Sequence, residues 1–228
     1  MTQYGALHGS MTSRKRTPPN LTGADRLMSW VGMKLRHRRA RLGYLTRESH
    51  AIDRLAPECR GLTEAALDEQ VALIRAVFLR GKIRREDVRR AMALVREVAR
   101  RETGEQAYPV QIVGALGLYH GRIVEMLTGE GKTLTGSIAA PLLAWKHRHL
   151  HIFTVNDYLA RRDSLSRKGT YTRCLCAVGA IQEEHTPAQR AEIYARPIVL
   201  ARPSRSPLTT CVTSCGWAHC ARPGQRGC

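Results

Sequence analysis

The chain has 228 residues, is 43% hydrophobic and carries a formal net charge of +18 at pH 7. This hydrophobic content is ordinary for a globular protein, so one domain or two small ones with a sizeable core can form. The positive charge makes phosphates, nucleic acid or an acidic lipid surface plausible partners without selecting among them.

Two classes of protein are excluded by the sequence pattern. The first twenty residues lack the apolar run of a signal peptide, and nowhere do roughly 18 apolar residues follow one another as a membrane span requires. Four of the seven cysteines fall in the last eighteen positions, so the cysteine count does not indicate a secreted disulfide framework. We therefore expect a cytoplasmic protein.

The N-terminal part is basic: residues 1–50 hold ten Lys or Arg residues against two acidic ones. We predict that residues 1–25 are disordered, because they are polar and are broken by Pro18, Pro19 and Gly23. Residues 26–50 suit a short basic helix, which either contacts acidic lipid or a partner, or is simply a solvated face.

Two longer helices complete a helical region that we place at 26–104. Thr63 is positioned to cap the first and Gly81 to end it, with apolar residues at helical spacing between them. The second ends near Gly104. We expect its solvent-exposed face to carry Arg84, Arg89, Arg90 and Arg96.

The pattern then changes to a strand, a glycine-containing loop, a helix and a second strand. We predict strands at 123–126 and 150–155 and a helix at 131–147, which together form a βαβ unit of a parallel sheet. A further helix is expected to start at Thr186. These elements define a nucleotide-binding region at 105–199.

The strongest chemical signal is the loop MLTGEGKT at 126–133, between the first predicted strand and its helix. Gly129 and Gly131 permit a tight turn whose amides point at one place, where the following helix adds its positive end. This is a phosphate-binding loop, with Lys132 for the β and γ phosphates and the Thr133 hydroxyl as a Mg²⁺ ligand. Met126 replaces the glycine of the strict pattern, a variant typical of helicase-like motors.

Three segments resemble the SecA family of preprotein translocase motors: GRIVEMLTGEGKTL, VQIVGALGLYHGRIVEM and TVNDYLARRD. The resemblance is clear over about 60–163, resumes at 179–195 and ends after Val199. It implies an incomplete α/β RecA-like P-loop domain, with a parallel sheet flanked by helices, preceded by a basic helical N-terminal arm.

The resemblance also assigns roles to individual residues. It implies that Gln111 reads adenine, that the stretch Thr128, Gly129, Glu130, Gly131 and Lys132 holds the phosphates, that Thr133 meets Mg²⁺ and that Arg162 approaches the nucleotide. The residues Asn156, Asp157 and Tyr158 would shape the loop after the second strand.

By the same resemblance, the expected function is ATP binding in a motor that drives preproteins through the SecYEG channel at the cytoplasmic face of the membrane. Two parts that ATP cleavage needs are missing from the sequence: a Walker B carboxylate pair and a second RecA-like domain. The acidic run at 182–184 is not a substitute, because Gln182 stands where an Asp is needed. We therefore expect ATP binding without hydrolysis by this chain alone.

The segment 200–228 is predicted to be a disordered tail rich in Arg, Pro and Cys. Its cysteines, at 211, 215, 220 and 228, do not have the paired spacing of a zinc site. A reading-frame change near residue 200 is our hypothesis for its origin. Two alternative interpretations of the whole chain remain open here: a fragment of a DEAD-type nucleic-acid helicase, and a truncated product without function.

Overall fold

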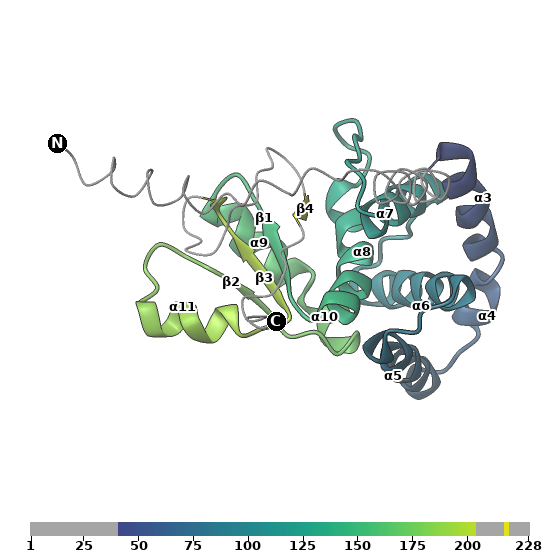
Figure 1. Cartoon of the computed structure of the whole chain (residues 1–228), viewed down its shortest axis with the longest axis horizontal. Helices are drawn as coiled ribbons and strands as arrows, with labels where there is room; N and C mark the ends of the chain where they lie inside the picture. Colours follow the sequence, from purple (N-terminus) through teal and green to yellow (C-terminus); the bar gives the residue numbers. More distant parts are fainter. Residues whose placement is uncertain (1–40, 204–216, 219–228) are drawn as a thin grey trace, which may run out of the picture. The chain divides into compact units, whose positions relative to one another are not determined.

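A computed structural model describes residues 41–203 and 217–218 of the chain. The chain divides into two units after Arg38, and the described residues all belong to the second. Three predicted segments lie wholly or mostly outside the described residues: the disordered segment 1–25, the basic helix at 26–50 up to residue 40, and the tail at 200–228 apart from residues 200–203 and 217–218. The secondary structure of the second unit changes from helices to a mixed helix and strand region along the chain (Figure 1).

Six helices come first in the described part. They are α3 (Leu42–Asp53), α4 (Ala56–Arg60), α5 (Glu64–Arg80), α6 (Arg85–Thr103), α7 (Pro109–Tyr119) and α8 (Lys132–His147). The boundaries predicted for α5 are confirmed: the Thr63 hydroxyl accepts a hydrogen bond from the Ala66 amide, and Gly81 ends the helix with φ of 79°. Gly104 ends α6 in the same left-handed conformation.

Arg96 does not lie on a solvent-exposed face of α6, so this part of the sequence prediction is wrong. Its side chain is 7% exposed, its guanidinium donates to the Ala107 carbonyl at 2.9 and 2.6 Å, and it pairs with Asp53 at 2.7 Å. The chain after α6 folds back over the helix and brings that carbonyl to Arg96. Each guanidinium nitrogen of this buried arginine thereby has an acceptor, which helical periodicity does not reveal.

A four-stranded sheet follows, with strand order β2-β3-β1-β4. The strands are β1 (Leu150–Phe153), β2 (Val178–Ala180), β3 (Ile198–Ala201) and β4 (Trp217–Ala218), and the helices between them are α9 (Asp157–Ser166), α10 (Lys168–Arg173) and α11 (Pro187–Tyr194). The first three strands are parallel, and β4 pairs antiparallel with β1. The boundary predicted for the tail, at residue 200, therefore falls inside β3.

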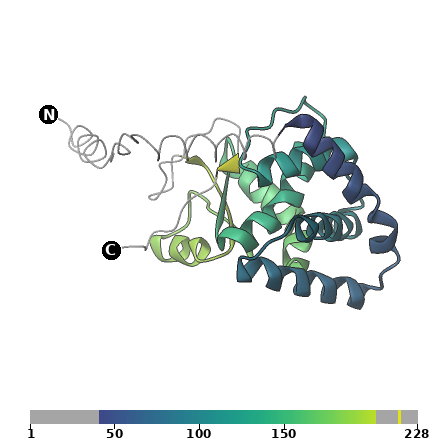
Figure 2. The same ribbon diagram turned by 45° about the vertical axis from the view of Figure 1, so that its right-hand side comes forward.

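The predicted class is confirmed: the chain is an α/β protein whose three parallel strands are flanked by helices, as in a partial RecA-like domain. The link between the two regions is α8, which packs on α5, α6 and α7 and also on β1 (Figure 2). The helix predicted from Thr186 is also confirmed, because Thr186 and Gln189 cap α11 reciprocally.

The strand predicted at 123–126 is not formed. These residues have no regular secondary structure, although their burial alternates as in a strand, with Val124 packed against Gly117 while Ile123 is 96% exposed. Their backbone makes no hydrogen bond with another backbone group in the part of the chain that the structure describes. A strand is defined by its ladder, so local sequence preference alone cannot complete one.

Carboxylates held by arginines connect the helices. Glu97, whose side chain is 5% exposed, pairs with Arg100 and Arg101, and Arg101 also pairs with Glu64 and donates to carbonyls of the α4–α5 turn. Burial alone would raise the pKa of Glu97, but the hydrogen bonds from the two arginines hold it below its ordinary value of 4.5.

This carboxylate should make folding stability depend on pH. A lowered pKa in the folded state adds stability that is fully present above pH 4.5 and is lost as the pH falls through the folded pKa. We expect Glu97→Gln to lower the midpoint of urea unfolding at pH 7 and to change it much less at pH 3. Glu69→Gln, at an exposed position of α5, is the matched control; an equal effect of both substitutions would contradict this assignment.

Candidate functional site

The loop at 126–133 leads from the segment at 123–126 into α8 and forms a tight turn. Gly129 and Gly131 have φ of 89° and 76°, in the left-handed region that favours glycine, and Lys132 is the first residue of the helix. The amides of Gly129, Gly131, Lys132 and Thr133 have no backbone acceptor among the described residues. The start of a sixteen-residue helix therefore presents a cluster of donors together with its positive end.

Gln111, in the first turn of α7, lies directly against this loop. Its Nε2 donates to the Glu130 carbonyl at 3.0 Å, and its Oε1 accepts from the Tyr108 amide at 2.7 Å. A Cβ built on Gly131 would stand 2.5 Å from that Nε2, so the loop can approach Gln111 only because residue 131 is glycine. The fold thus brings together two sequence motifs that are separated by about twenty residues.

Two charged side chains of the loop have different environments. The Glu130 carboxylate accepts from the Leu127 amide at 3.0 Å and so stabilises the turn from within. Lys132 is exposed and has no carboxylate partner in the described part of the chain. The ammonium of Lys132 is consequently available to an anion at the loop, while Glu130 serves the loop itself. The loop motif predicts Glu130 among the phosphate ligands and does not reveal its additional hydrogen bond to the Leu127 amide.

The segment TVNDYLARRD forms the turn after β1 and the start of α9. Asn156 caps α9 by accepting from the Leu159 amide at 2.8 Å, and the Thr154 hydroxyl donates to the Asn156 carbonyl at 2.9 Å. Arg162 is half-exposed and pairs with its neighbour Asp163 at 2.7 Å, which keeps the pKa of its guanidinium above the ordinary value. The described residues show no interaction between Arg162 and the loop at 126–133.

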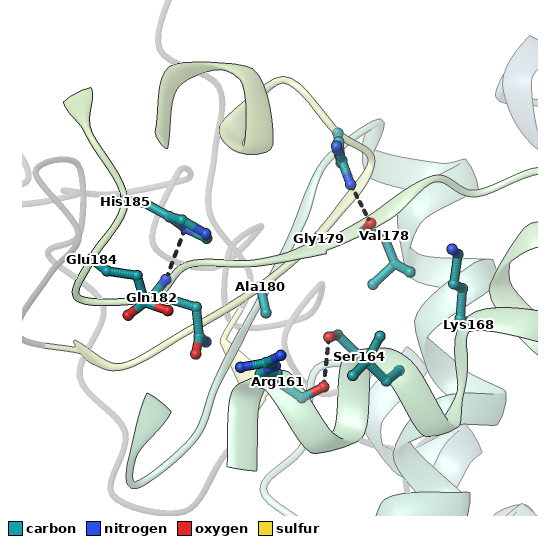
Figure 3. A pocket seen from close by; sticks show the side chains of 11 residues that line it. Arg161, Ser164, Lys168, Val178, Gly179, Ala180, Gln182, Glu184 and His185 are labelled. Carbon is teal, nitrogen blue, oxygen red and sulfur yellow. Dashed lines mark hydrogen bonds between the residues drawn. The ribbon is translucent and has the colours of Figure 1, made fainter. Parts of the chain in front are cut away.

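The neighbouring Arg161 instead lines a cavity of about 390 Å³ between α9 and the edge strand β2 (Figure 3). Gln182 and His185 line the same cavity from the loop after β2, where the Gln182 backbone amide donates to the His185 Nδ1 at 3.1 Å. The Gln182 side chain donates to the Asp157 carbonyl at 3.1 Å. Gln182 therefore helps to hold the loop after β2 against α9. This is a structural role for the residue that occupies the place of a Walker B Asp in the acidic run.

Candidate metal ligands do not form a cluster in the part of the chain that the structure describes. Across residues 41–203 and 217–218, no three His, Cys, Asp or Glu side chains gather in a way that could hold a metal ion. Mg²⁺ at the loop would therefore depend on the half-buried Thr133 together with the oxygens of a bound phosphate. Within the same ranges, no helix is long and apolar enough to cross a bilayer.

Comparisons with known proteins give a consistent result. A family model described as the SecA DEAD-like domain matches residues 31–205. The chain is 35% identical over 187 residues to protein translocase subunit SecA 2 of Chlorobium chlorochromatii, 40% over 148 residues to protein translocase subunit SecA of Beijerinckia indica, and 46% over 129 residues to that of Gloeobacter violaceus.

Each match covers a large share of this chain but a small share of the relative. The matches cover 79%, 65% and 54% of this chain, but only 28%, 16% and 14% of those three relatives. All three are named as protein translocase subunits, and the comparisons give no support to the nucleic-acid helicase alternative.

Proposed function

Because this chain belongs to the SecA family, through its DEAD-like domain, we propose that it binds MgATP at the loop 126–133. The observation that carries the proposal is the cluster of amides of Gly129, Gly131, Lys132 and Thr133, which have no backbone acceptor among the described residues and lie at the start of α8, against Gln111. Such a cluster is complementary to a polyphosphate, because several donors and a helix end converge on one negative group.

Each predicted ligand has a definite role in this proposal. The loop residues 128–132 hold the phosphates through those amides that have no backbone acceptor among the described residues, with the exposed ammonium of Lys132 beside the β and γ phosphates. The Thr133 hydroxyl is a Mg²⁺ ligand, and Mg²⁺ would supply charge neutralisation between the phosphates. Gln111 keeps one amide hydrogen and one oxygen lone pair for adenine, since each end of its side chain makes a single hydrogen bond with the described residues.

The loop passes a simple test of fit for a phosphate group. A Cβ built on Gly129 would meet nothing within 4 Å, so open space lies beside the loop backbone at this residue. The donor set consists of amides, an ammonium and a hydroxyl, which suits an oxyanion. Arg162, which pairs with Asp163, would have to exchange that partner to approach a nucleotide, and we propose that it does so only with nucleotide present.

The wider role follows the family. We propose that nucleotide binding here serves protein translocation, with preprotein and the SecYEG channel as partners at the cytoplasmic face of the membrane, and with acidic lipid as a possible contact of the basic N-terminal region. The relatives are named as translocase subunits, and the chain spans between 14 and 28% of their length. The proposal for this chain is therefore confined to nucleotide binding within such a system.

Thermal unfolding with and without MgATP tests the binding step. A ligand that binds only the folded chain stabilises it by about 2.7 kcal/mol at a concentration one hundred times its Kd, so the midpoint should rise with nucleotide concentration. We expect Lys132→Ala to abolish most of this rise, because the ammonium facing the β and γ phosphates is lost. Lys82→Ala, which removes a lysine at another exposed position, should preserve it.

The outcomes separate the alternatives. If MgATP raises the unfolding midpoint of wild type and Lys82→Ala but not that of Lys132→Ala, the result supports a nucleotide site at the loop 126–133. An equal rise in all three chains would place nucleotide elsewhere. No rise in wild type at millimolar MgATP would contradict the proposal and favour a truncated product without function.

A further inference from the structure

A second cavity, of about 580 Å³, lies in the helical region and includes no residue of the nucleotide loop. It is formed by α3, the turn before α6, the first turns of α6, and the C-terminal ends of α7 and α8, elements that Figure 1 shows gathered on one side of the unit. Its volume is on the scale of sites for small molecules. Three arginines, a lysine and one carboxylate line it: Arg84, Arg85, Arg89, Lys146 and Glu48.

Glu48 fixes two of these cations. Its side chain is 4% exposed, and it receives hydrogen bonds from both Arg85 and Arg89, with Arg85 Nε at 2.9 Å and Arg89 Nε at 2.7 Å. Burial alone would raise the pKa of Glu48, but its hydrogen bonds with the two arginines lower it, so the carboxylate is ionised at neutral pH. Its oxygens are occupied, and the two guanidiniums are held side by side.

The other two cations have no carboxylate partner among the described residues. Arg84 precedes α6, and its side chain makes no ion pair there. Lys146 lies in the last turn of α8, with its Nζ 4.7 Å from the centre of the Tyr119 ring. With four cations against one buried carboxylate, the lining has a formal net charge of +3. Asp87, which accepts from the Arg84 amide at 2.8 Å, caps α6 and is not part of the lining.

Aromatic rings contact two of the four cations, Arg85 and Lys146. The Arg85 guanidinium lies 5.5 Å from the Tyr44 ring centre, and the His120 ring packs edge-on against both Tyr44 and Tyr119. Stacking of this kind restricts the side-chain rotamers before any ligand arrives. Three of the four cations, Arg85, Arg89 and Lys146, are therefore held by Glu48 or by rings, which differs from the solvated charges of a flat basic surface.

We propose that this cavity binds the phosphoryl group of a small soluble ligand, at a site separate from the nucleotide loop. Guanidinium groups already oriented by Glu48 retain N–H donors for an oxyanion, and Arg84 and Lys146 supply the unpaired charge that a dianion requires. Concavity and size favour a soluble molecule over a lipid headgroup, which a flat basic face would serve.

Inorganic pyrophosphate is the probe, measured by calorimetry with the full chain. All variants carry Lys132→Ala, so that the nucleotide loop does not contribute. In that background we expect the pair Arg84→Gln and Lys146→Gln to weaken pyrophosphate binding by about tenfold for each cation removed. The pair Arg47→Gln and Arg54→Gln removes the same charge from exposed positions outside the lining and should leave the affinity within about twofold.

Several results would overturn the proposal. One is an absence of pyrophosphate binding in the Lys132→Ala background when circular dichroism shows a folded chain. Another is equal weakening by the two pairs, which would mean a general effect of net charge. A third concerns vesicles that contain phosphatidylglycerol. If the pair Arg84→Gln and Lys146→Gln abolished binding to these vesicles and left pyrophosphate binding unchanged, the proposal of a soluble ligand would be wrong. Since the Lys132→Ala background removes the proposed nucleotide site, failure here and failure of MgATP binding are distinguishable.

Discussion

Replacing Trp145 by alanine is expected to destabilise the folded chain by about 3–5 kcal/mol, the cost typical of deleting a large buried aromatic side chain. Trp145 lies in α8, is 2% exposed and packs edge-on against Phe78 of α5 with ring centres 5.6 Å apart. Its Nε1 donates to the Cys174 carbonyl at 2.9 Å, beyond α10. One side chain thus joins the helical region to the segment leading into β2.

Urea unfolding monitored by circular dichroism measures this effect. Trp145→Phe separates its two components, because phenylalanine keeps most of the apolar contact while the Cys174 carbonyl loses its donor. We expect it to cost about 1–3 kcal/mol, the typical penalty for an unsatisfied buried polar group. If Trp145→Ala cost less than Trp145→Phe, the contact with Phe78 would not be the main contribution.

The second large effect is expected at Gly131, where alanine should both strain the loop and displace Gln111. Its φ of 76° costs a residue with a Cβ about 1–2 kcal/mol, and the new Cβ would stand 2.5 Å from Gln111 Nε2. Gln111 would then lose its bond to the Glu130 carbonyl. We expect Gly131→Ala to lower the unfolding midpoint and to remove most of the stabilisation by MgATP.

Gly121→Ala is a matched control for the strain alone. Gly121 also has a positive φ, of 70°, but a Cβ there would meet nothing within 4 Å, and it lies outside the phosphate loop. It should lower the midpoint through strain and leave the rise with MgATP intact. Loss of that rise in Gly121→Ala as well would show that general destabilisation, and not the contact with Gln111, reduces binding.

Several features of this protein could be predicted from short stretches of sequence. The N-termini of α5 and α11 are capped by hydrogen bonds within four residues, from the Ala66 amide to Thr63 and from the Gln189 amide to Thr186. The local sequence therefore determines where these helices begin. The turn at Gly129 and Gly131 is likewise local, since glycine alone adopts its positive φ without strain. The family was recognisable for the same reason, because its motifs are contiguous.

Other features were decided only when distant segments met. Arg96 is buried because the Ala107 carbonyl and Asp53 reach it from two directions. Residues 123–126 form no ladder with the part of the chain that the structure describes, because a ladder needs a second chain segment. The cationic cavity gathers residues from Tyr44 to Lys146, so no sequence window contains it. The sequence therefore determined the features that hydrogen bonds between near neighbours control. Burial, strand pairing and charge clustering depended on the tertiary structure, because their partners come from segments that are distant in the sequence.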